Sequence, residues 1–411
     1  MKFKETLLLM ACLTVTAAPA QSLHSEAQPM LTDGILNFDL GGSGNRVRIG
    51  GFISAEGHLT EVKNDNNESG FNLEHTLFNV EGSFLDDKLG FFLQTDFTLN
   101  YPLLDAYVTW QPVKDLRLTA GQKQTFTNSR DMMLHDQMTA FGGRHSGMSQ
   151  SLNDTGRELG VFAEYRIPSK TVGLDIGAAV TSGDGRNSFG SSSVDSDCGG
   201  LKYGGRVTLY PLGYFKRGNE MVFHDFVRET TPKIALGAAF SFNDGTSHKV
   251  GEGHGDFTMY DIDGETAYPD YRKWSADLML KWQGFTLLAD WQNTTATHLD
   301  NLYTAASAAS KLRPEQIADY LALGNGVDVQ VGYLFRSLWA VDAAWSYVKP
   351  EFDETDNSSL NKKSSIDLGV SKYIFNNTVK LQLLGNYTKY RTEFMKPYKN
   401  RSVKLNVQVM F

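Results

Sequence analysis

Residues 272–292 read RKWSADLMLKWQGFTLLADWQ, and apolar and polar side chains alternate along both halves of this stretch. In the first half, one face carries Trp274, Ala276, Leu278, Leu280 and Trp282. The opposite face carries Lys273, Ser275, Asp277 and Lys281. A period of two residues is typical of a β-strand with one apolar and one polar face. Because Gln283-Gly284 between the halves has the composition of a tight turn, the stretch predicts a β-hairpin.

The same alternation recurs along the chain. We count about sixteen such segments, with ends uncertain by about two to four residues, near residues 46–60, 71–84, 89–99, 103–112, 116–128, 157–167, 172–182, 201–210, 233–243, 272–283, 284–294, 326–336, 338–348, 364–375, 378–390 and 400–411. Most are about ten residues long, the length that a tilted strand needs to cross a bilayer. The chain contains no apolar run of about 18 residues, such as a transmembrane helix needs.

The links between these segments alternate in length. Short links with turn-forming residues lie at 85–88, 168–171, 283–284 and 376–377. Long links lie at 61–70, 129–156, 183–200, 244–271, 295–325, 349–363 and 391–399, while the long link at 211–232 and the short link at 100–102 break the alternation. Short turns at one end and long loops at the other are typical of outer-membrane barrels. The sequence therefore predicts an all-β transmembrane antiparallel β-barrel of about 16 strands, with long extracellular loops and short periplasmic turns.

The surrounding solvent decides which face of each strand points outward. Lipid cannot hydrogen-bond to polar groups, so the apolar face must contact outer-membrane lipids and the polar face must line the lumen. Several aromatic residues near strand ends fit an interfacial girdle, although each ring alone fits core packing equally well: Trp110, Tyr210, Trp282, Trp291, Trp339, Tyr347 and Tyr373. One long loop also carries a predicted helix, Arg313–Leu323, with Ala305–Leu312 as a further turn or two before it.

The N-terminus has the features of an export signal. Lys2 and Lys4 precede an apolar core, Leu7–Ala18, and Ala18-Pro19-Ala20 fits a cleavage site. We therefore expect residues 1–20 to be a signal peptide, 21–45 a periplasmic segment before the barrel, and 46–411 the transmembrane barrel. A lipoprotein signal ending at Cys12 is the less favoured alternative, because its apolar core would be very short. The expected location is the outer membrane of a Gram-negative cell.

Charge and cysteine content exclude some functions. The formal net charge is -8, spread over the chain, which argues against nucleic acid as a partner because nucleic-acid binding needs a basic face. Cys198 is the one cysteine outside the predicted signal peptide, so no intramolecular disulfide is expected.

Several motifs resemble the phosphate-selective porins O and P, and the similarity extends over nearly all of the chain after residue 20. The motifs are VRIGGF at 47–52, LTAGQKQTF at 118–126, RELGV at 157–161, and an alternating last strand that ends in Phe411. The resemblance implies a sixteen-stranded, usually trimeric porin, and so a homotrimer, with residues 118–126 entering a constriction loop. It also implies anion-binding roles for Lys123 and Arg157.

The loop at 129–156 is the best candidate for a selectivity site. It carries Arg130, Arg144 and His145, and arginines at a constriction favour anions through charge-assisted hydrogen bonds. A solvated surface loop is an equally weighted alternative. Further pore-lining candidates on the polar strand faces are Arg46, Arg48, Arg117 and Arg166. The same faces carry Glu56, Asp96, Asp105, Glu164, Asp175, Asp277, Asp290, Asp342 and Asp367. This mixed lining does not predict a strong preference for phosphate.

Metal binding and catalysis receive little support. His248, His254 and Asp256 match no metal-ligand spacing. Asp261, Asp263 and Glu265 lack the later ligands of a calcium loop. No G-x-S-x-G elbow occurs. We therefore expect no metal, no cofactor and no enzyme activity, but passive diffusion of small ions and charged solutes, phosphate or other anions among them. A surface receptor or adhesin barrel with a poorly conducting lumen is the alternative.

Overall fold

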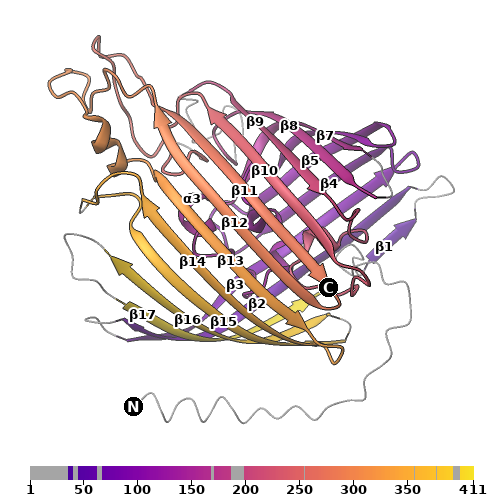
Figure 1. Ribbon diagram of the computed structural model, residues 1–411. Coiled ribbons are helices and arrows are strands. Elements are labelled where there is room, and N and C mark those ends of the chain that lie inside the picture. The colour runs from indigo at the N-terminus through magenta and orange to yellow at the C-terminus, as the bar shows by residue number, and fades with distance from the viewer. Residues whose placement is uncertain are drawn as a thin grey trace.

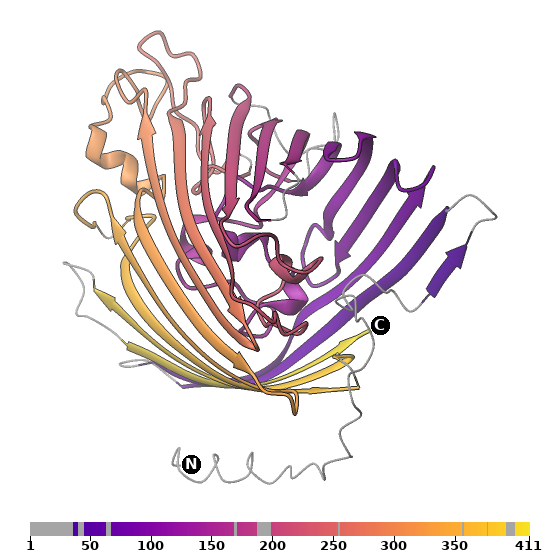
Figure 2. The ribbon, with the colours of Figure 1, turned by 45° about the vertical axis from the view of Figure 1, so that its right-hand side comes forward.

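The computed structural model describes residues 36–39, 45–62, 67–167, 171–186, 199–253, 255–355, 357–375, 377–391 and 399–411. Within these residues, sixteen antiparallel strands, β2 to β17, form one continuous sheet that closes on itself (Figure 1). A turned view shows the strands around an interior that several shorter segments occupy (Figure 2). The predicted all-β antiparallel barrel of about sixteen strands is confirmed.

The strand bounds lie within a few residues of the predicted ones. The barrel strands are β2 (Arg46–Val62), β3 (Glu68–Phe84), β4 (Leu89–Asp96), β5 (Leu103–Val113), β6 (Leu116–Gln124), β7 (Arg157–Ile167), β8 (Gly173–Thr181), β9 (Lys202–Tyr210), β10 (Lys233–Asn243), β11 (Asp270–Trp282), β12 (Phe285–Thr297), β13 (Gly324–Leu334), β14 (Trp339–Pro350), β15 (Lys362–Ile374), β16 (Val379–Arg391) and β17 (Lys399–Met410). A short strand before them is β1 (Leu36–Asp39), and the short helices are α2 (Arg130–Met133), η1 (Asp136–Met138), α3 (Ser149–Leu152), η3 (Asn219–Met221) and η4 (Pro314–Asp319).

The barrel closes between its last and first strands. β17 pairs with β2 from Asn400 opposite Val62 to Met410 opposite Phe52. The backbones of Gly51 and Phe411 exchange two further hydrogen bonds, of 2.7 and 2.9 Å. Because each of the sixteen strands has a partner on both sides, their backbone N–H and C=O groups are paired as a lipid environment requires.

β14 illustrates how the alternation places side chains. Trp339, Val341 and Trp345 point outward and are 48%, 43% and 44% exposed. Asp342 and Ser346 point inward and are buried. A two-sheet sandwich would bury the apolar row instead. An apolar outer wall around a polar interior is the arrangement of a barrel that stands in a membrane.

Two of the expected girdle residues are placed differently. Trp110, Trp282, Trp291, Trp339 and Tyr347 lie on the outer face, whereas Tyr210 and Tyr373 point into the lumen and are buried. The prediction was wrong for these two because it used their position near a strand end and ignored their parity. Tyr210 follows Arg206 and Thr208 at two-residue intervals, and therefore shares their inward face.

The two ends of the barrel differ in their connections. At one end, Gln283-Gly284 joins β11 to β12 with φ angles of 48° and 95°, the backbone of a two-residue hairpin turn. At the other end the links are mostly long, and we call this end extracellular and the short-turn end periplasmic. Both predicted exceptions remain. A short link at 97–102 joins β4 to β5, and residues 211–232 form a long link at the periplasmic end.

The predicted loop helix is much shorter in the structure. Of Arg313–Leu323, Pro314–Asp319 form a 3₁₀ helix, η4, and Ala305–Leu312 contain one turn, closed by the hydrogen bond from Ala308 N–H to the Ala305 carbonyl, but no helix. The alanines there have helical propensity, but the chain at Tyr303 and Lys311 forms an isolated β-bridge instead. Within the described part of the chain, no helix is long and apolar enough to span a membrane. The predicted signal peptide, most of the pre-barrel segment, Cys198 and His254 lie outside the described residues.

Candidate functional site

Residues 125–156, which we call the constriction loop, lie inside the barrel rather than on its surface (Figure 2). The loop leaves β6 after Gln124 and returns at Arg157, the first residue of β7, and it carries α2, η1 and α3. Most of its side chains are buried. Helices of three or four residues are not stable on their own, so contacts with the barrel wall must hold the loop in place.

The first anchor of the loop is on β11 and β12. Arg130 Nε donates to Asp277 Oδ1 over 2.6 Å, and both groups are buried. Asp290 accepts from the backbone N–H groups of Arg130 and Asp131, at 2.8 and 3.2 Å. Arg206 on β9 also pairs with Asp277. Arg130 therefore fixes the loop to a carboxylate that already carries a second arginine.

The second anchor is on β2 and β3, across the lumen from the first. Arg144 Nη2 lies 2.6 Å from Glu74 Oε1 and 3.0 Å from Glu56 Oε1. Lys404 Nζ on β17 also reaches Glu56 Oε1, at 2.9 Å. The positive charge of Arg144 is thus balanced by two carboxylates, and its side chain is partly exposed. The loop is tied to both sides of the barrel by its two arginines.

A charged network lies at the centre of the loop. Arg157 Nη2 is 2.9 Å from Asp136 Oδ2, and Arg157 Nε is 3.4 Å from Asp105 Oδ2. The ring nitrogens of His145 lie 3.5 Å from Asp131 and 3.5 Å from Asp136. Burial alone would lower the pKa of His145, but these two carboxylates raise it to about 10. Burial would raise the pKa of Asp136, but Arg157 and His145 bring it well below its usual range. The loop therefore carries a charged histidine at neutral pH.

A second segment enters the lumen from the other end. Residues 211–232, which we call the periplasmic segment, meet the constriction loop through two backbone hydrogen bonds, Phe223 N to Met138 O and His135 N to Met221 O, both of 3.0 Å. Phe223 is fully buried in an apolar cluster that includes residues of both segments. The unusual length of this link was visible in the sequence, but its entry into the lumen was not expected.

Polar groups of the wall hold the periplasmic segment. His224 lies 2.8 Å from Asp342 through Nε2 and 3.0 Å from the Tyr373 hydroxyl through Nδ1. The buried ammonium of Lys281 donates to the backbone carbonyl of Val222 at 2.6 Å and to that of Asn219. Tyr373 and Lys281 thus act as docking groups for the segment.

The wall from β2 to β7 carries cations that neither segment covers completely. Lys123 Nζ lies 3.1 Å from Glu164, and Arg48 Nη1 lies 3.4 Å from Glu81. Arg117 is exposed, and its opposite residue across β6 and β7 is the lumen-facing Glu164. Among the described residues, no carboxylate lies within ion-pair distance of Arg117. Of these three cations Arg117 is exposed, whereas the side chains of Lys123 and Arg48 are 15% and 19% exposed.

The eight candidate cations fall into three groups. Arg130, Arg144 and Arg157 come together around the constriction loop, each on a carboxylate. Lys123, Arg48 and Arg117 lie along the less covered wall. Arg46 and Arg166 are the third group, half-exposed at the periplasmic end, where Arg46 pairs with Asp87 and Arg166 pairs with Asp175, both at 2.8 Å. The carboxylate partners Asp136 and Glu74 were not singled out from the sequence, because nothing local indicates which acid meets which arginine.

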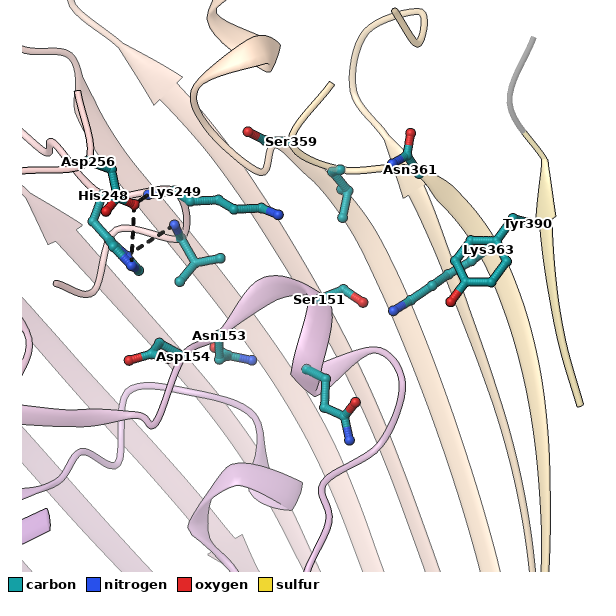
Figure 3. A pocket seen from close by; sticks show the side chains of 13 residues that line it. Ser151, Asn153, Asp154, His248, Lys249, Asp256, Ser359, Asn361, Lys363 and Tyr390 are labelled. Carbon is teal, nitrogen blue, oxygen red and sulfur yellow. Dashed lines mark hydrogen bonds and ion pairs between the residues drawn. The ribbon is translucent and has the colours of Figure 1, made fainter. Parts of the chain in front are cut away.

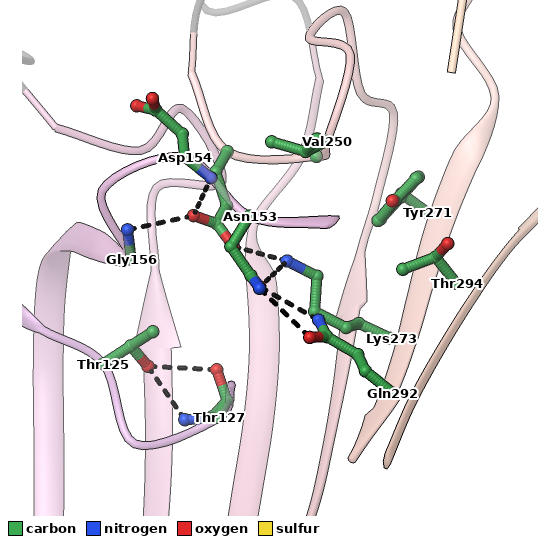
Figure 4. A network of polar contacts seen from close by, with 12 residues as sticks. Thr125, Thr127, Asn153, Asp154, Gly156, Val250, Tyr271, Lys273, Gln292 and Thr294 are labelled. Carbon is green, nitrogen blue, oxygen red and sulfur yellow. Dashed lines mark hydrogen bonds and ion pairs between the residues drawn. The ribbon is translucent and has the colours of Figure 1, made fainter. Parts of the chain in front are cut away.

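The extracellular loop between β10 and β11 also reaches inward (Figure 4). Glu252 pairs with the buried Lys273 of β11 and accepts from the backbone N–H groups of Asp154 and Gly156, at 3.3 and 3.2 Å. The side chain of Asn153 accepts from Lys273 at 2.9 Å. His248 and Asp256 of the same loop are 3.6 Å apart. Across the residues that the structure describes, no three His, Cys, Asp or Glu side chains are arranged to hold a metal ion.

Solved structures of outer-membrane proteins are similar to this fold. The outer membrane channel DcaP of Acinetobacter baumannii is 13% identical, with a TM-score of 0.57 over 92% of this chain and 100% of DcaP. Salmonella typhi OmpF, in a complex with daunomycin, is 14% identical, with a TM-score of 0.53 over 92% of this chain and 100% of OmpF. The trimer form of OmpT, an outer membrane protein of Vibrio cholerae, is 9% identical, with a TM-score of 0.51 over 89% of this chain and 99% of OmpT. At these identities the likeness is one of fold. No family model and no curated protein sequence matches the chain.

Proposed function

We propose that this chain is a porin of a Gram-negative outer membrane that lets small charged solutes diffuse passively through its lumen. The observation that carries the proposal is the constriction loop, which arginines anchor to opposite walls of a closed barrel. The apolar outer wall and the likeness in fold to DcaP and OmpF support the location. Diffusion through a water-filled passage needs no energy input and no covalent step.

Selectivity is the finer part of the proposal. We propose that anions, phosphate among them, pass along Arg117 and Lys123 on the less covered wall. Three candidate arginines at the constriction are already neutralised by carboxylates, so the preference for anions is weak and no tight phosphate site is expected there. This is the pattern of a general filter for charge, because fixed charges of both signs attract ions of both signs.

Assembly as a homotrimer is a further part of the proposal. The wall around β4 and β5 is low, since a short link joins these strands at the extracellular end. Phe97 and Tyr101 on this link are 63% and 50% exposed. A low, apolar stretch of wall suits burial against another copy, and OmpT of Vibrio cholerae has a trimer form with the same fold.

Planar-bilayer recording tests the proposal. The purified protein should give ohmic conductance, and a salt gradient should give a small reversal potential of the sign expected for anions. Phosphate titrated as a blocker should reduce the conductance only at millimolar concentrations. A cation-selective reversal potential without any phosphate effect would remove the anion part and leave the channel intact.

The two segments inside the barrel favour a second candidate, a surface receptor or adhesin whose lumen conducts poorly. This candidate predicts ligand binding through the extracellular loops together with little or no steady conductance. The same recordings separate the two, since a correctly folded, heat-modifiable barrel that gives no channels would support the receptor.

A further inference from the structure

A cavity of about 370 Å³ lies at the extracellular mouth of the lumen (Figure 3). Its walls come from α3 of the constriction loop, from residues 248–250 of the β10–β11 loop, and from residues 359–361 before β15. Lys363 of β15 and Tyr390 of β16 complete it, and these two residues are opposite each other on the inner face of the barrel. The cavity therefore borders the interior of the barrel, on the route that a solute takes from outside.

Two lysines enter this cavity. Lys249 and Lys363 extend toward it from different walls (Figure 3). Within the described part of the chain, neither ammonium group has an ion pair or a hydrogen bond. Most other inward-facing cations of this barrel are paired, as Lys273 is with Glu252 and Lys202 with Glu158. Two unneutralised ammonium groups around one cavity attract an anion, and they offer it charge-assisted hydrogen bonds.

The acidic residues of the cavity lie at its other end. Figure 3 shows Asp256 beside His248, and their side chains are 3.6 Å apart. Asp256 also accepts from the backbone N–H of Lys249 at 3.3 Å. Asp154 lies at this end as well. The charges are thus separated along the cavity, and the lysine end is free to hold the anionic group of a solute.

The neutral lining indicates what the rest of the solute carries. Ser151 and Ser359 donate their hydroxyl protons to the carbonyl groups of Gly147 and Asp319, so their oxygens remain available as acceptors. The amide of Asn361 offers both a donor and an acceptor. Hydroxyl and amide groups in a cavity recognise hydroxylated molecules. The volume is within the range of about 300–1,000 Å³ that is usual for small-molecule sites, so a bare inorganic phosphate would leave most of it to water.

We propose that this cavity, the lysine pocket, is an entry site for an anionic, hydroxylated solute such as a sugar phosphate or a sugar acid. Its phosphate or carboxylate group lies between Lys249 and Lys363, and its hydroxyl groups contact Ser151 and Asn361. The inference rests on the proposed function, since it names the class of solute that the channel collects before the constriction.

Calorimetric titration of the purified barrel in detergent tests the pocket, with glucose 6-phosphate, glucose and inorganic phosphate as probes. Glucose 6-phosphate should bind measurably, and both glucose and inorganic phosphate at least tenfold more weakly. The double variant Lys249→Gln, Lys363→Gln should lose at least tenfold in affinity for glucose 6-phosphate. Lys349→Gln is the matched control, because Lys349 is exposed on the outer face of β14 at the same end of the barrel, and it should bind as the wild type does.

A second variant separates recognition of the hydroxyl groups of the solute from recognition of its anionic group. Asn361→Ala should weaken glucose 6-phosphate several-fold and leave inorganic phosphate unchanged. Unaltered affinity in the double lysine variant, or equal affinity for glucose and glucose 6-phosphate, would overturn the proposal. Heat-modifiable migration in each variant confirms that the barrel is folded.

Conductance distinguishes failure of the pocket from failure of the channel. If the wild type conducts and the double lysine variant binds unchanged, the pocket is wrong and the channel stands. If the wild type forms no channels but binds glucose 6-phosphate through the two lysines, the channel is wrong and the pocket belongs to a receptor.

Discussion

The constriction loop and the periplasmic segment both lie inside the barrel, but different forces hold them there. The constriction loop is fixed by buried ion pairs, above all Arg130 with Asp277 and Arg157 with Asp136. The periplasmic segment is fixed by Phe223 in an apolar cluster and by backbone carbonyls on Lys281. One lumen thus contains two segments that are held in different ways. The position of the constriction loop depends on buried ion pairs, whereas the position of the periplasmic segment depends on apolar packing together with the hydrogen bonds of His224 and Lys281.

The largest effect on stability is expected at the constriction loop. Arg157→Ala leaves Asp105 buried without its cation and Asp136 with His145 alone, and breaking a buried pair from one side costs about 3–5 kcal/mol. The free energy of unfolding should fall by that amount in urea titrations in detergent, and single-channel current should become noisier as the loop loosens. Arg166→Ala removes a half-exposed arginine from its pair with Asp175, and this matched control should cost less than about 1 kcal/mol. Equal losses of unfolding free energy in the two variants would contradict the conclusion that buried ion pairs hold the constriction loop in place.

The next largest effect on stability is expected at the periplasmic segment. Phe223→Ala creates a cavity in the apolar cluster and should cost about 3 kcal/mol. Limited digestion with trypsin should then cut faster at Arg217 or Arg228 of the periplasmic segment. The increase should be the same at low and high salt, because apolar packing is not screened. If added salt alone exposed these sites in the wild type, the periplasmic segment would depend on ion pairs as the constriction loop does, and the distinction between the two segments would be wrong.

Raising the pH should destabilise the constriction loop. The pKa of His145 is raised from about 6.5 to about 10 by Asp131 and Asp136. Its charged form therefore contributes its full stabilisation below about pH 6.5, and this is lost as the pH rises through about 10. Conductance should change between about pH 9 and 11 as the loop loosens.

His145→Gln provides the control for this titration. It should remove the step that belongs to the histidine, whereas tyrosines and lysines that titrate in the same range remain. His248→Gln, in the β10–β11 loop, should keep the step. A step that survives in His145→Gln would assign the pH response to another group.

The smallest effect on stability is expected at an exposed cation of the lumen wall. Arg117→Gln removes an exposed, unpaired charge and should change the free energy of unfolding by less than about 0.5 kcal/mol. Its reversal potential in a salt gradient should nevertheless move toward cation selectivity. Arg46→Gln, at the periplasmic rim and paired with Asp87, should move it less. No difference between these variants would remove Arg117 from the solute path.

The barrel could be predicted from the amino-acid sequence alone. Alternation with a period of two is local information, since it shows which side chains of a strand share a face. In lipid, a closed barrel is the arrangement that pairs the backbone hydrogen-bonding groups of every strand. All sixteen predicted segments are strands, and the last one, ending at Phe411, closes the sheet. The sequence also bounded the long loop at 129–156 and named Arg130, Arg144 and Arg157 within it or at its end, but it left a surface position of the loop equally open.

The contacts of those residues could not be predicted, because they form only in the folded barrel. The partners of Arg130 and Arg144 are far away in the chain, on β11 and β3, and no spacing in the sequence links them. The inward position of the periplasmic segment was equally hidden, because it depends on Phe223, Tyr373 and Lys281 meeting across the lumen. Strand faces follow from neighbouring residues, whereas the charge that a solute meets depends on pairs formed only when the sheet closes.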